Sequence, residues 1–428
     1  MREPVQEPVR GHPAAAGGDA AAPAVGAARG AVPPTRRRPT RPRRRPIRRA
    51  AAVAHRVLGL TAGLILVVLG LSGSALVFRD EIDRALNPRL RRVAPAASRV
   101  PVQAVVAAAT SPFPGERAWR VRVPRTADGT YEVWLVRGTA TAAEPSRYAY
   151  VDPYRGVLLG ARGPTASLTG ALFHLHTHLL AGAFGERVAG ASGLVLALLG
   201  GTGLVVWWPG RGRVRTALTV ARGASRKRQM YDLHRSVGFY ASAFLGLAGV
   251  TGASLVFHEP FRRGIYWATR TPDERPAPSA PSPASLPALP LDTLLRVAER
   301  ALPGGTVSYL YLPTRPRDAL RVRTRRASEL HPNGKSFVHV DPRTAAVLGV
   351  EDGAAAPAGA RAYSAVYPLH TGVVGGTATR VVAAAVGLTP ALLFATGVAI
   401  WRGRRRSRAR PVIAARAPAR GPDGGGPR

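Results

Sequence analysis

The chain contains no cysteine among its 428 residues. This absence excludes disulfides, thiolate nucleophiles, iron–sulfur clusters, covalent CxxCH haem attachment and cysteine-based zinc sites. Convincing Walker A, dinucleotide, G-x-S-x-G and H-E-x-x-H signatures are missing as well. Any metal or cofactor must therefore be held by histidine, carboxylate or backbone groups.

Acidic residues and lysine are scarce. The sequence has 61 Lys and Arg against 24 Asp and Glu, a formal net charge of +37, and only Lys227 and Lys335 are lysines. The arginines concentrate in three runs, 36–49, 211–228 and 402–410, and each run adjoins a long apolar segment. A nucleic-acid-binding protein would instead spread this charge over a domain. We therefore expect a membrane protein whose partner is the lipid bilayer and not nucleic acid.

Four apolar segments of about 20 residues carry no charge, and each is long enough to cross a hydrocarbon core of about 30 Å as a helix. These segments are 57–78, 188–208, 237–257 and 381–401. Because arginine-rich segments stay in the cytoplasm, the three arginine runs are predicted to share that side of the membrane. The sequence thus predicts a multi-pass protein of the bacterial cytoplasmic (inner) membrane, with both termini cytoplasmic and two long segments facing outward.

The chain repeats itself once. The matching stretches are HRVLG at 55–59 with HRSVG at 234–238, LSGSALVF at 71–78 with VTGASLVF at 250–257, VDP at 151–153 with VDP at 340–342, LHT at 175–177 with LHT at 369–371, and the T-G…W endings at 202–207 and 396–401. Each half reads as span, outer domain, histidine-containing segment and span. Two halves in the same orientation predict parallel repeats about an axis along the membrane normal.

Each outer segment shows the same pattern of one apolar-periodic helix followed by short alternating strands. In the first half the helix is expected near 102–109 and the strands near 118–123, 131–136, 147–151 and 156–159. In the second half the helix is expected near 291–302 and the strands near 306–312, 319–324, 336–340 and 346–348. The sequence therefore predicts a small α+β module that occurs twice.

These patterns divide the chain into eleven successive segments. They are a disordered basic cytoplasmic tail (1–50), a first transmembrane helix (51–78), a first outer domain (79–170), an outer histidine-containing segment (171–187), a second transmembrane helix (188–208), a basic cytoplasmic loop (209–233), a third transmembrane helix (234–257), a linker with a second outer domain (258–365), a second histidine-containing segment (366–380), a fourth transmembrane helix (381–401) and a basic cytoplasmic tail (402–428).

The repeated motifs, in this order, resemble the PepSY-associated transmembrane family over roughly residues 54–406. The resemblance implies an α-helical integral membrane protein with four transmembrane helices in two parallel repeats, each with a small extracytoplasmic α+β PepSY-like domain. The family includes proteins described as iron-regulated membrane proteins and ferric-siderophore reductases, and some of these carry b-type haem.

Four histidines are placed by the repeat. His55 and His234 lie at the cytoplasmic starts of the first and third spans, and His176 and His370 lie just outside the membrane before the second and fourth. Ionisable residues at these depths are functional candidates, and the members of each pair are able to face one another across the repeat axis. Neutral imidazole is a good ligand of haem iron, and bis-histidine haem transfers electrons. With the family resemblance, this pattern predicts two b-type haems.

Neighbouring residues suit haem but have a simpler explanation too. Gly59 and Gly238 lie four residues after His55 and His234, so each shares its histidine's helix face and leaves room for a macrocycle. Arg56 and Arg235 are candidates for pairing with the haem propionates. Alternatively, the glycines are small-residue helix contacts and the arginines anchor the interface.

Other histidines form weaker candidate sites. His174, His176 and His178 make an H-x-H-x-H run that suits Zn²⁺ or Cu²⁺ if it folds as a strand, whereas a helix would align only the first and last. His258, at the outer end of the third span, is an asymmetric candidate for an outer ligand.

Three functions follow as hypotheses. The first is a haem-b electron conduit, an oxidoreductase of the ferric-chelate reductase type, which passes electrons from the cytoplasmic side to a ferric siderophore or other Fe(III) chelate. The cytoplasmic segments are too short and basic for a flavin or NAD domain, so its donor must be a separate flavin or NAD(P)H reductase, or quinol. The second is a non-enzymatic membrane-anchored PepSY module that binds or regulates peptidases or assists assembly. The third is a metal or haem uptake accessory.

Overall fold

The computed structural model describes residues 46–138, 145–273, 276–283 and 285–414, with side chains as far as 406. Most of the two predicted basic tails, 1–45 and 415–428, lies outside the described residues. The first helix, α1 (Pro46–Thr61), begins inside the segment that the sequence assigned to the N-terminal tail. The last helix, α14 (Gly376–Ala414), continues well into the predicted C-terminal tail.

Three helical stretches within the described residues are long and apolar enough to cross a membrane. They are Gly182–Trp207, Arg226–Val256 and Val373–Arg406. A fourth crossing exists if α1 and α2 (Gly63–Leu76), which meet at an angle of 64°, form one span. The chain is thus a membrane protein with several apolar helices, as its composition predicts.

The first predicted span is not one straight helix. The Thr61 hydroxyl donates a hydrogen bond back to the Val57 carbonyl (2.9 Å), an interaction that bends helices. A Cβ on Gly63 would collide with the ring of Phe394 in α14, so only glycine lets that ring pack into the bend. In the second half, α9 (Arg226–Val256) runs through the corresponding region without a break.

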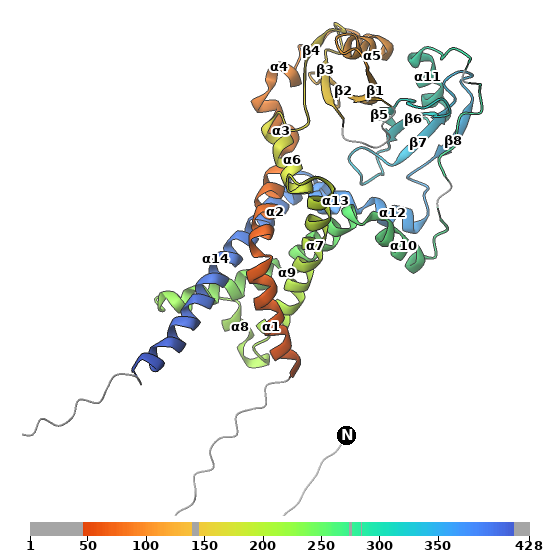
Figure 1. Cartoon of the computed structure of the whole chain (residues 1–428). Helices are drawn as coiled ribbons and strands as arrows, with labels where there is room; N and C mark the ends of the chain where they lie inside the picture. The colour runs from red at the N-terminus through yellow and green to blue at the C-terminus, as the bar shows by residue number, and fades with distance from the viewer. Residues whose placement is uncertain (1–45, 139–144, 274–275, 284, 415–428) are drawn as a thin grey trace, which may run out of the picture. The chain divides into compact units, whose positions relative to one another are not determined.

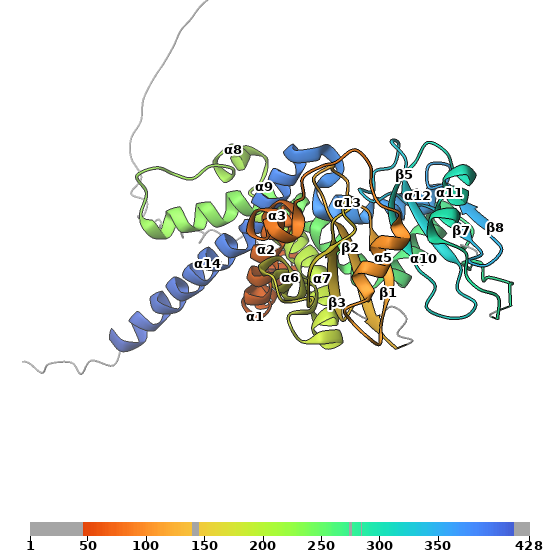
Figure 2. The same ribbon diagram turned by 90° about the horizontal axis from the view of Figure 1, so that it is seen from above.

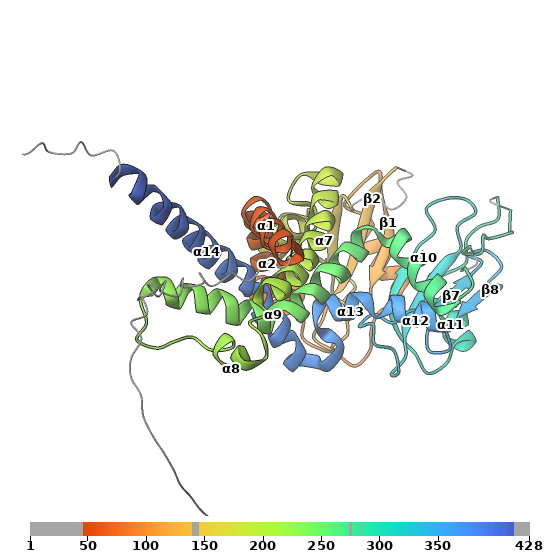
Figure 3. The same ribbon diagram turned by 90° about the horizontal axis from the view of Figure 1, so that it is seen from below.

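Glycines join the two halves inside the helical bundle. Helix α7 (Gly182–Trp207) packs along α9, and α14 packs along both α2 and α9; Figure 3 shows α1, α2, α7 and α9 gathered side by side. A Cβ on Gly193 of α7 would lie 2.6 Å from the carbonyl oxygen of Gly249 in α9. A Cβ on Gly387 of α14 would lie 2.9 Å from the carbonyl oxygen of Gly70 in α2. The repeat therefore places one close glycine crossing on each side of its axis.

Short helices connect the long ones to the β-strands (Figure 1). They are α3 (Arg79–Leu86), α4 (Pro88–Arg91), α6 (Leu168–His178), α10 (His258–Thr269), α12 (Ala358–Ser364) and α13 (Val366–Thr371), with a 3₁₀ turn, η2 (Val373–Gly375), before α14. The connection between α7 and α9 holds η1 (Arg211–Arg213) and α8 (Val214–Ala217). The sequence did not predict these as helices, apart from the helical alternative for the H-x-H-x-H run, which the structure confirms in α6.

Every predicted helix and strand is present in the two α+β modules, which we call the outer modules after their predicted side of the membrane. The first module contains α5 (Val102–Thr110) and strands β1 (Glu116–Arg122), β2 (Tyr131–Arg137), β3 (Arg147–Val151) and β4 (Leu158–Arg162). The second contains α11 (Leu291–Ala301) and strands β5 (Thr306–Tyr311), β6 (Leu320–Arg325), β7 (Ser336–Val340) and β8 (Val347–Glu351).

The two modules share one sheet, which the sequence did not predict. The strand order is β4-β3-β2-β1-β5-β6-β7-β8, and every neighbouring pair is antiparallel. At the junction, Arg120 and Val121 of β1 lie opposite Tyr311 and Leu310 of β5. The pairing of β1 with β5 removes one edge strand from each module.

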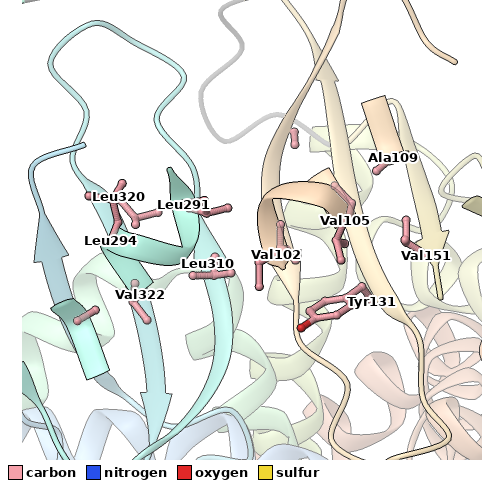
Figure 4. Close-up of a cluster of buried hydrophobic side chains, with 14 of the residues drawn as sticks. Val102, Val105, Ala109, Tyr131, Val151, Leu291, Leu294, Leu310, Leu320 and Val322 are labelled. Carbon is pink, nitrogen blue, oxygen red and sulfur yellow. The ribbon is translucent and has the colours of Figure 1, made fainter. Parts of the chain in front are cut away.

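One face of the sheet carries the hydrophobic core. Helix α5 packs beside β1–β3 and α11 beside β6–β8 (Figure 2). Alternate strand residues such as Val121, Val133, Leu310 and Val322 are fully buried beneath these helices, with one cluster running through both modules (Figure 4). The alternate residues between them form the opposite face of the sheet.

A buried group of charges fixes the first module to the end of the membrane helices. The Arg91 guanidinium of α4 pairs with Asp83 of α3 (3.2 Å) and with Glu132 of β2 (2.7 Å). Arg162 of β4 also pairs with Asp83 (2.5 Å). The Arg91, Asp83 and Glu132 side chains are 10%, 6% and 12% exposed, so each charge depends on its partners.

Candidate functional site

The four repeat-related histidines meet as two pairs. His176 on α6 and His370 on α13 have ring centroids 6.1 Å apart; we call them the outer pair after their predicted side of the membrane. His55 on α1 and His234 on α9 have ring centroids 6.2 Å apart, with their planes nearly perpendicular; we call them the cytoplasmic pair after their predicted side. Each pair takes one histidine from each half of the chain, as the spacing of the repeat predicts.

A partner helix of the same half holds each outer imidazole by its Nδ1. In the first half, Nδ1 of His176 lies 3.0 Å from the Leu69 carbonyl and 3.2 Å from the Ser72 hydroxyl of α2. In the second half, Nδ1 of His370 lies 3.1 Å from the Thr251 hydroxyl of α9.

The cytoplasmic pair is held in the same manner. Nδ1 of His55 lies 3.2 Å from both the Leu199 carbonyl and the Thr202 hydroxyl of α7. Nδ1 of His234 lies 2.9 Å from the Thr396 hydroxyl of α14.

These contacts select one tautomer of each imidazole. A carbonyl oxygen only accepts, so Nδ1 of His55 and of His176 carries the proton. All four hydroxyls donate to carbonyls one turn earlier in their own helices, which leaves an oxygen lone pair to accept from Nδ1–H. Nε2 of each ring is therefore the nitrogen with a free lone pair, which is the state that binds a metal.

A glycine next to each hydroxyl residue leaves room for the imidazole ring against the helix. A Cβ on Gly73 would lie 2.8 Å from Cε1 of His176, and a Cβ on Gly252 would lie 2.9 Å from Cε1 of His370. The corresponding distances at the cytoplasmic pair are 3.1 Å from Gly203 and 3.5 Å from Gly397. In the sequence these hydroxyl–glycine dipeptides stand out only as markers of the repeat. Their occurrence once per predicted histidine was the signal that would have identified their role.

Two imidazoles at this spacing suit one metal between them. With a metal–nitrogen bond of about 2 Å on each side, and a ring centroid about 1 Å behind each nitrogen, opposed ligands place their centroids about 6 Å apart. Among the described residues, no group of three or more His, Cys, Asp or Glu is arranged to hold a metal ion. A pair of histidines alone therefore suits a metal whose other ligands arrive with it, as the four nitrogens of a porphyrin do.

Gly59 and Gly238, next to the cytoplasmic pair, have similar surroundings, whereas Arg56 and Arg235 do not. A Cβ on Gly59 or Gly238 would make only an ordinary contact with Leu199 (3.8 Å) or Leu393 (3.7 Å), so neither position is packed too tightly for a small side chain. Arg56 is exposed. Arg235 instead lies 3.2 Å from the buried Asp232 carboxylate and donates to the Thr216 carbonyl (2.6 Å).

The weaker histidine candidates do not join either pair. His174 and His178 stack on each other in α6 with centroids 5.6 Å apart, whereas His176 between them faces His370. His258 is exposed at the first residue of α10. The H-x-H-x-H run thus does not form the three-histidine metal site that a strand would have allowed.

The sheet contacts the helix that bears the outer histidine of the second half. His331, in the loop between β6 and β7, stacks on Tyr367 of α13 with centroids 5.0 Å apart. Burial and the charges of Arg323 and Lys335 lower the pKa of His331 to about 3. The outer histidine pair therefore lies next to a positively charged part of the sheet.

Comparisons with known proteins agree with the motifs. A comparison with curated proteins returns no match. The family model of the PepSY-associated TM region matches residues 52–404, which include both histidine pairs and the whole sheet. The chain therefore belongs to the PepSY-associated TM region family.

Proposed function

We propose that this protein is a haem-b electron conduit of the bacterial inner membrane. In this proposal four spans form two parallel repeats, both termini lie in the cytoplasm, and two PepSY-like domains face outward. Electrons pass from the cytoplasmic side to an extracytoplasmic Fe(III) chelate, with ferric siderophores as the expected acceptors. The donor is a separate protein or quinol.

One observation carries the proposal, namely that four histidines form two facing pairs in which every Nδ1 is engaged. Such partly buried, oriented imidazoles fit axial ligation better than they fit a simple membrane anchor, for which the ring tautomer is irrelevant. Haem bound at each pair would supply a one-electron carrier near each membrane surface.

The length of α9 supports two separate carriers. His234 and Thr251, which bonds His370, lie on this one unbroken helix. Seventeen residues at 1.5 Å each separate them by roughly 25 Å, close to the thickness of the hydrocarbon core, about 30 Å. One pair therefore belongs near the cytoplasmic surface and the other near the outer surface.

The protein's own residues have three tasks in this function. The hydroxyls of Ser72, Thr202, Thr251 and Thr396 hold the imidazoles with Nε2 unprotonated. The adjacent glycines allow the rings to approach the partner helices. The two histidines of each pair would supply both protein ligands of a bound haem and leave no open position for oxygen, which suits electron transfer.

The test is a reduced-minus-oxidised visible spectrum of the detergent-purified full chain and of the variants His55→Ala, His370→Ala and His258→Ala. We expect a low-spin b-type spectrum, partly lost in the first two variants and retained in the third, which removes an exposed histidine. A protein that stays colourless after expression with added haem contradicts the proposal. That outcome would leave the membrane-anchored PepSY module or the uptake accessory as the function.

A further inference from the structure

The sheet face opposite α5 and α11 carries arginines interleaved with aromatic rings at the junction of the two modules. We call the set Arg120, Arg321, Trp119, Trp134, Tyr311 and Phe337 the arginine–aromatic face. Its members come from β1, β2, β5, β6 and β7 and lie between the residues that fill the core. All six are partly exposed. A ligand from the outer side is therefore able to contact this face.

Each of the two arginines lies against rings. The Arg120 guanidinium carbon is 4.3 Å from the Trp119 ring centroid, 4.4 Å from Trp134 and 4.6 Å from Tyr311. That of Arg321 is 4.3 Å from Tyr311 and 4.9 Å from Phe337. Stacking on rings orients a guanidinium but does not neutralise it.

Neither guanidinium has an ion pair or a hydrogen bond with any other group that the structure describes, and Nε of Arg120 is buried without a partner. By contrast, Arg122 on the same strand pairs with Asp80 at 2.6 Å. Burial, with the nearby charges of Arg321 and Arg323, lowers the pKa of Arg120. The charge of Arg321 helps to lower the pKa of the Glu351 carboxyl, so this arginine has a carboxylate nearby. Arg120 has none in the described part of the chain, and a partly buried cation without a counter-ion is costly, so an anion supplied from outside would stabilise this face.

The arginine–aromatic face is connected to the outer histidine pair. Arg323, next to Arg321 in the same face of β6, lies 3.1 Å from His331, and His331 stacks on Tyr367. Tyr367 belongs to α13, the same short helix that carries His370. A ligand on this face would therefore lie on the side of the sheet that contacts the proposed electron exit.

We propose that the arginine–aromatic face binds an anionic chelate whose donor groups are planar aromatic rings, such as a tris-catecholate complex of a trivalent metal. The chelate charge would neutralise Arg120 and Arg321, and its rings would stack on Trp119 and Trp134. Neutral hydroxamate chelates have neither feature. The role of this ligand as electron acceptor rests on the proposed function, whereas its binding does not.

The experiment titrates the full chain in detergent with the Ga(III) complex of a hexadentate tris-catecholate, and follows binding by calorimetry. Gallium takes no electron from the protein, so binding is measured without haem reduction. We expect Arg120→Gln and Arg321→Gln each to weaken binding about ten- to a hundred-fold, because each removes a charged contact. Arg300→Gln, which removes an exposed charge from α11 on the other face, should bind as the parent does. Added salt should weaken parental binding.

Equal affinity of the parent for a neutral tris-hydroxamate Ga(III) chelate, or unchanged tris-catecholate binding in both arginine variants, would overturn the inference. If Arg120→Gln fails to fold, Arg321→Gln carries the test. A protein that binds the gallium chelate but takes up no haem contradicts only the proposed electron transfer. A haem protein that reduces Fe(III) chelates equally well with and without these arginines contradicts only this binding site.

Discussion

Nδ1 of His234 in α9 lies 2.9 Å from the hydroxyl oxygen of Thr396 in α14. The Thr396 hydroxyl itself donates to the Leu392 carbonyl (2.7 Å), so its free lone pair accepts the imidazole proton. The same relationship joins His55 to Thr202, His176 to Ser72 and His370 to Thr251. The repeat therefore conserves between its halves both the position and the protonation of each candidate ligand.

Replacement of Thr396 by Val is expected to impair the cytoplasmic site while the fold is kept. Valine has nearly the same shape as threonine but cannot accept from Nδ1 of His234, so the ring loses its orientation. Loss of such a supporting hydrogen bond weakens a metal site about ten- to a hundred-fold. A redox titration of the visible spectrum should show lower occupancy and a shifted midpoint potential for one of two haems.

Thr389→Val is the matched control for this change. Thr389 lies in the same helix, and its hydroxyl donates to the Val386 carbonyl (2.7 Å). Both variants thus lose one hydroxyl from α14, but only Thr396 contacts a histidine. Equal effects of the two changes, or none from Thr396→Val, would show that the hydroxyl does not support a haem ligand.

Gly252→Ala is expected to disturb the outer site. The new Cβ would lie 2.9 Å from Cε1 of His370, closer than carbon atoms approach without displacement, so the ring must move away from α9. We expect loss of most of the outer haem signal in the visible spectrum. Gly246→Ala places a Cβ in open space on the same helix and should leave the spectrum unchanged. Retention of both haems in Gly252→Ala would mean that the ring position is not constrained as described.

The sequence predicted local structure well where the spacing of apolar residues follows one clear pattern. Alternation of buried residues such as Val133 and Leu135 identified the strands, and long uncharged runs identified the helices. Equivalent positions in the repeat also paired the four histidines correctly. These features depend on residues close in sequence or related by direct repetition.

Features that depend on distant contacts were not predicted. The pairing of β1 with β5 joins strands nearly two hundred residues apart, and neither strand differs in composition from an ordinary edge strand. The bend at Thr61 depends on Phe394 entering the space beside Gly63. Arg235 was a candidate for a propionate, but its contact with Asp232 depends on how α9 packs against the preceding loop.

Arg91→Met is expected to destabilise the first outer module strongly. Arg91 is the common partner of Asp83 and Glu132, and its removal leaves the buried Glu132 without its close cation and Asp83 with Arg162 alone. Breaking a buried ion pair by removing one partner costs about 3–5 kcal/mol. Thermal unfolding of the purified chain should show a clearly lower midpoint. Arg89→Met, which changes an exposed arginine of the same short helix, should behave like the parent; equal midpoints for both variants would contradict the role of the buried group.

His331→Gln is expected to reduce the acid sensitivity of the outer region. Burial and the neighbouring cations lower the pKa of folded-state His331 from 6.5 to about 3. Between these values the unfolded chain binds a proton that the folded chain does not, so stability falls as the pH drops from 6.5 towards 3. Above pH 6.5 neither state holds the proton on this imidazole, and the effect vanishes.

Glutamine does not titrate, so the variant loses the uptake of about one proton on unfolding between pH 4 and 6.5. Its thermal midpoint should therefore depend less steeply on pH in this range. His258→Gln removes an exposed histidine and should leave the parental slope unchanged. An unaltered slope in His331→Gln would mean that His331 is protonated in the folded protein, which its contacts with Arg323 and the Asn333 N–H oppose.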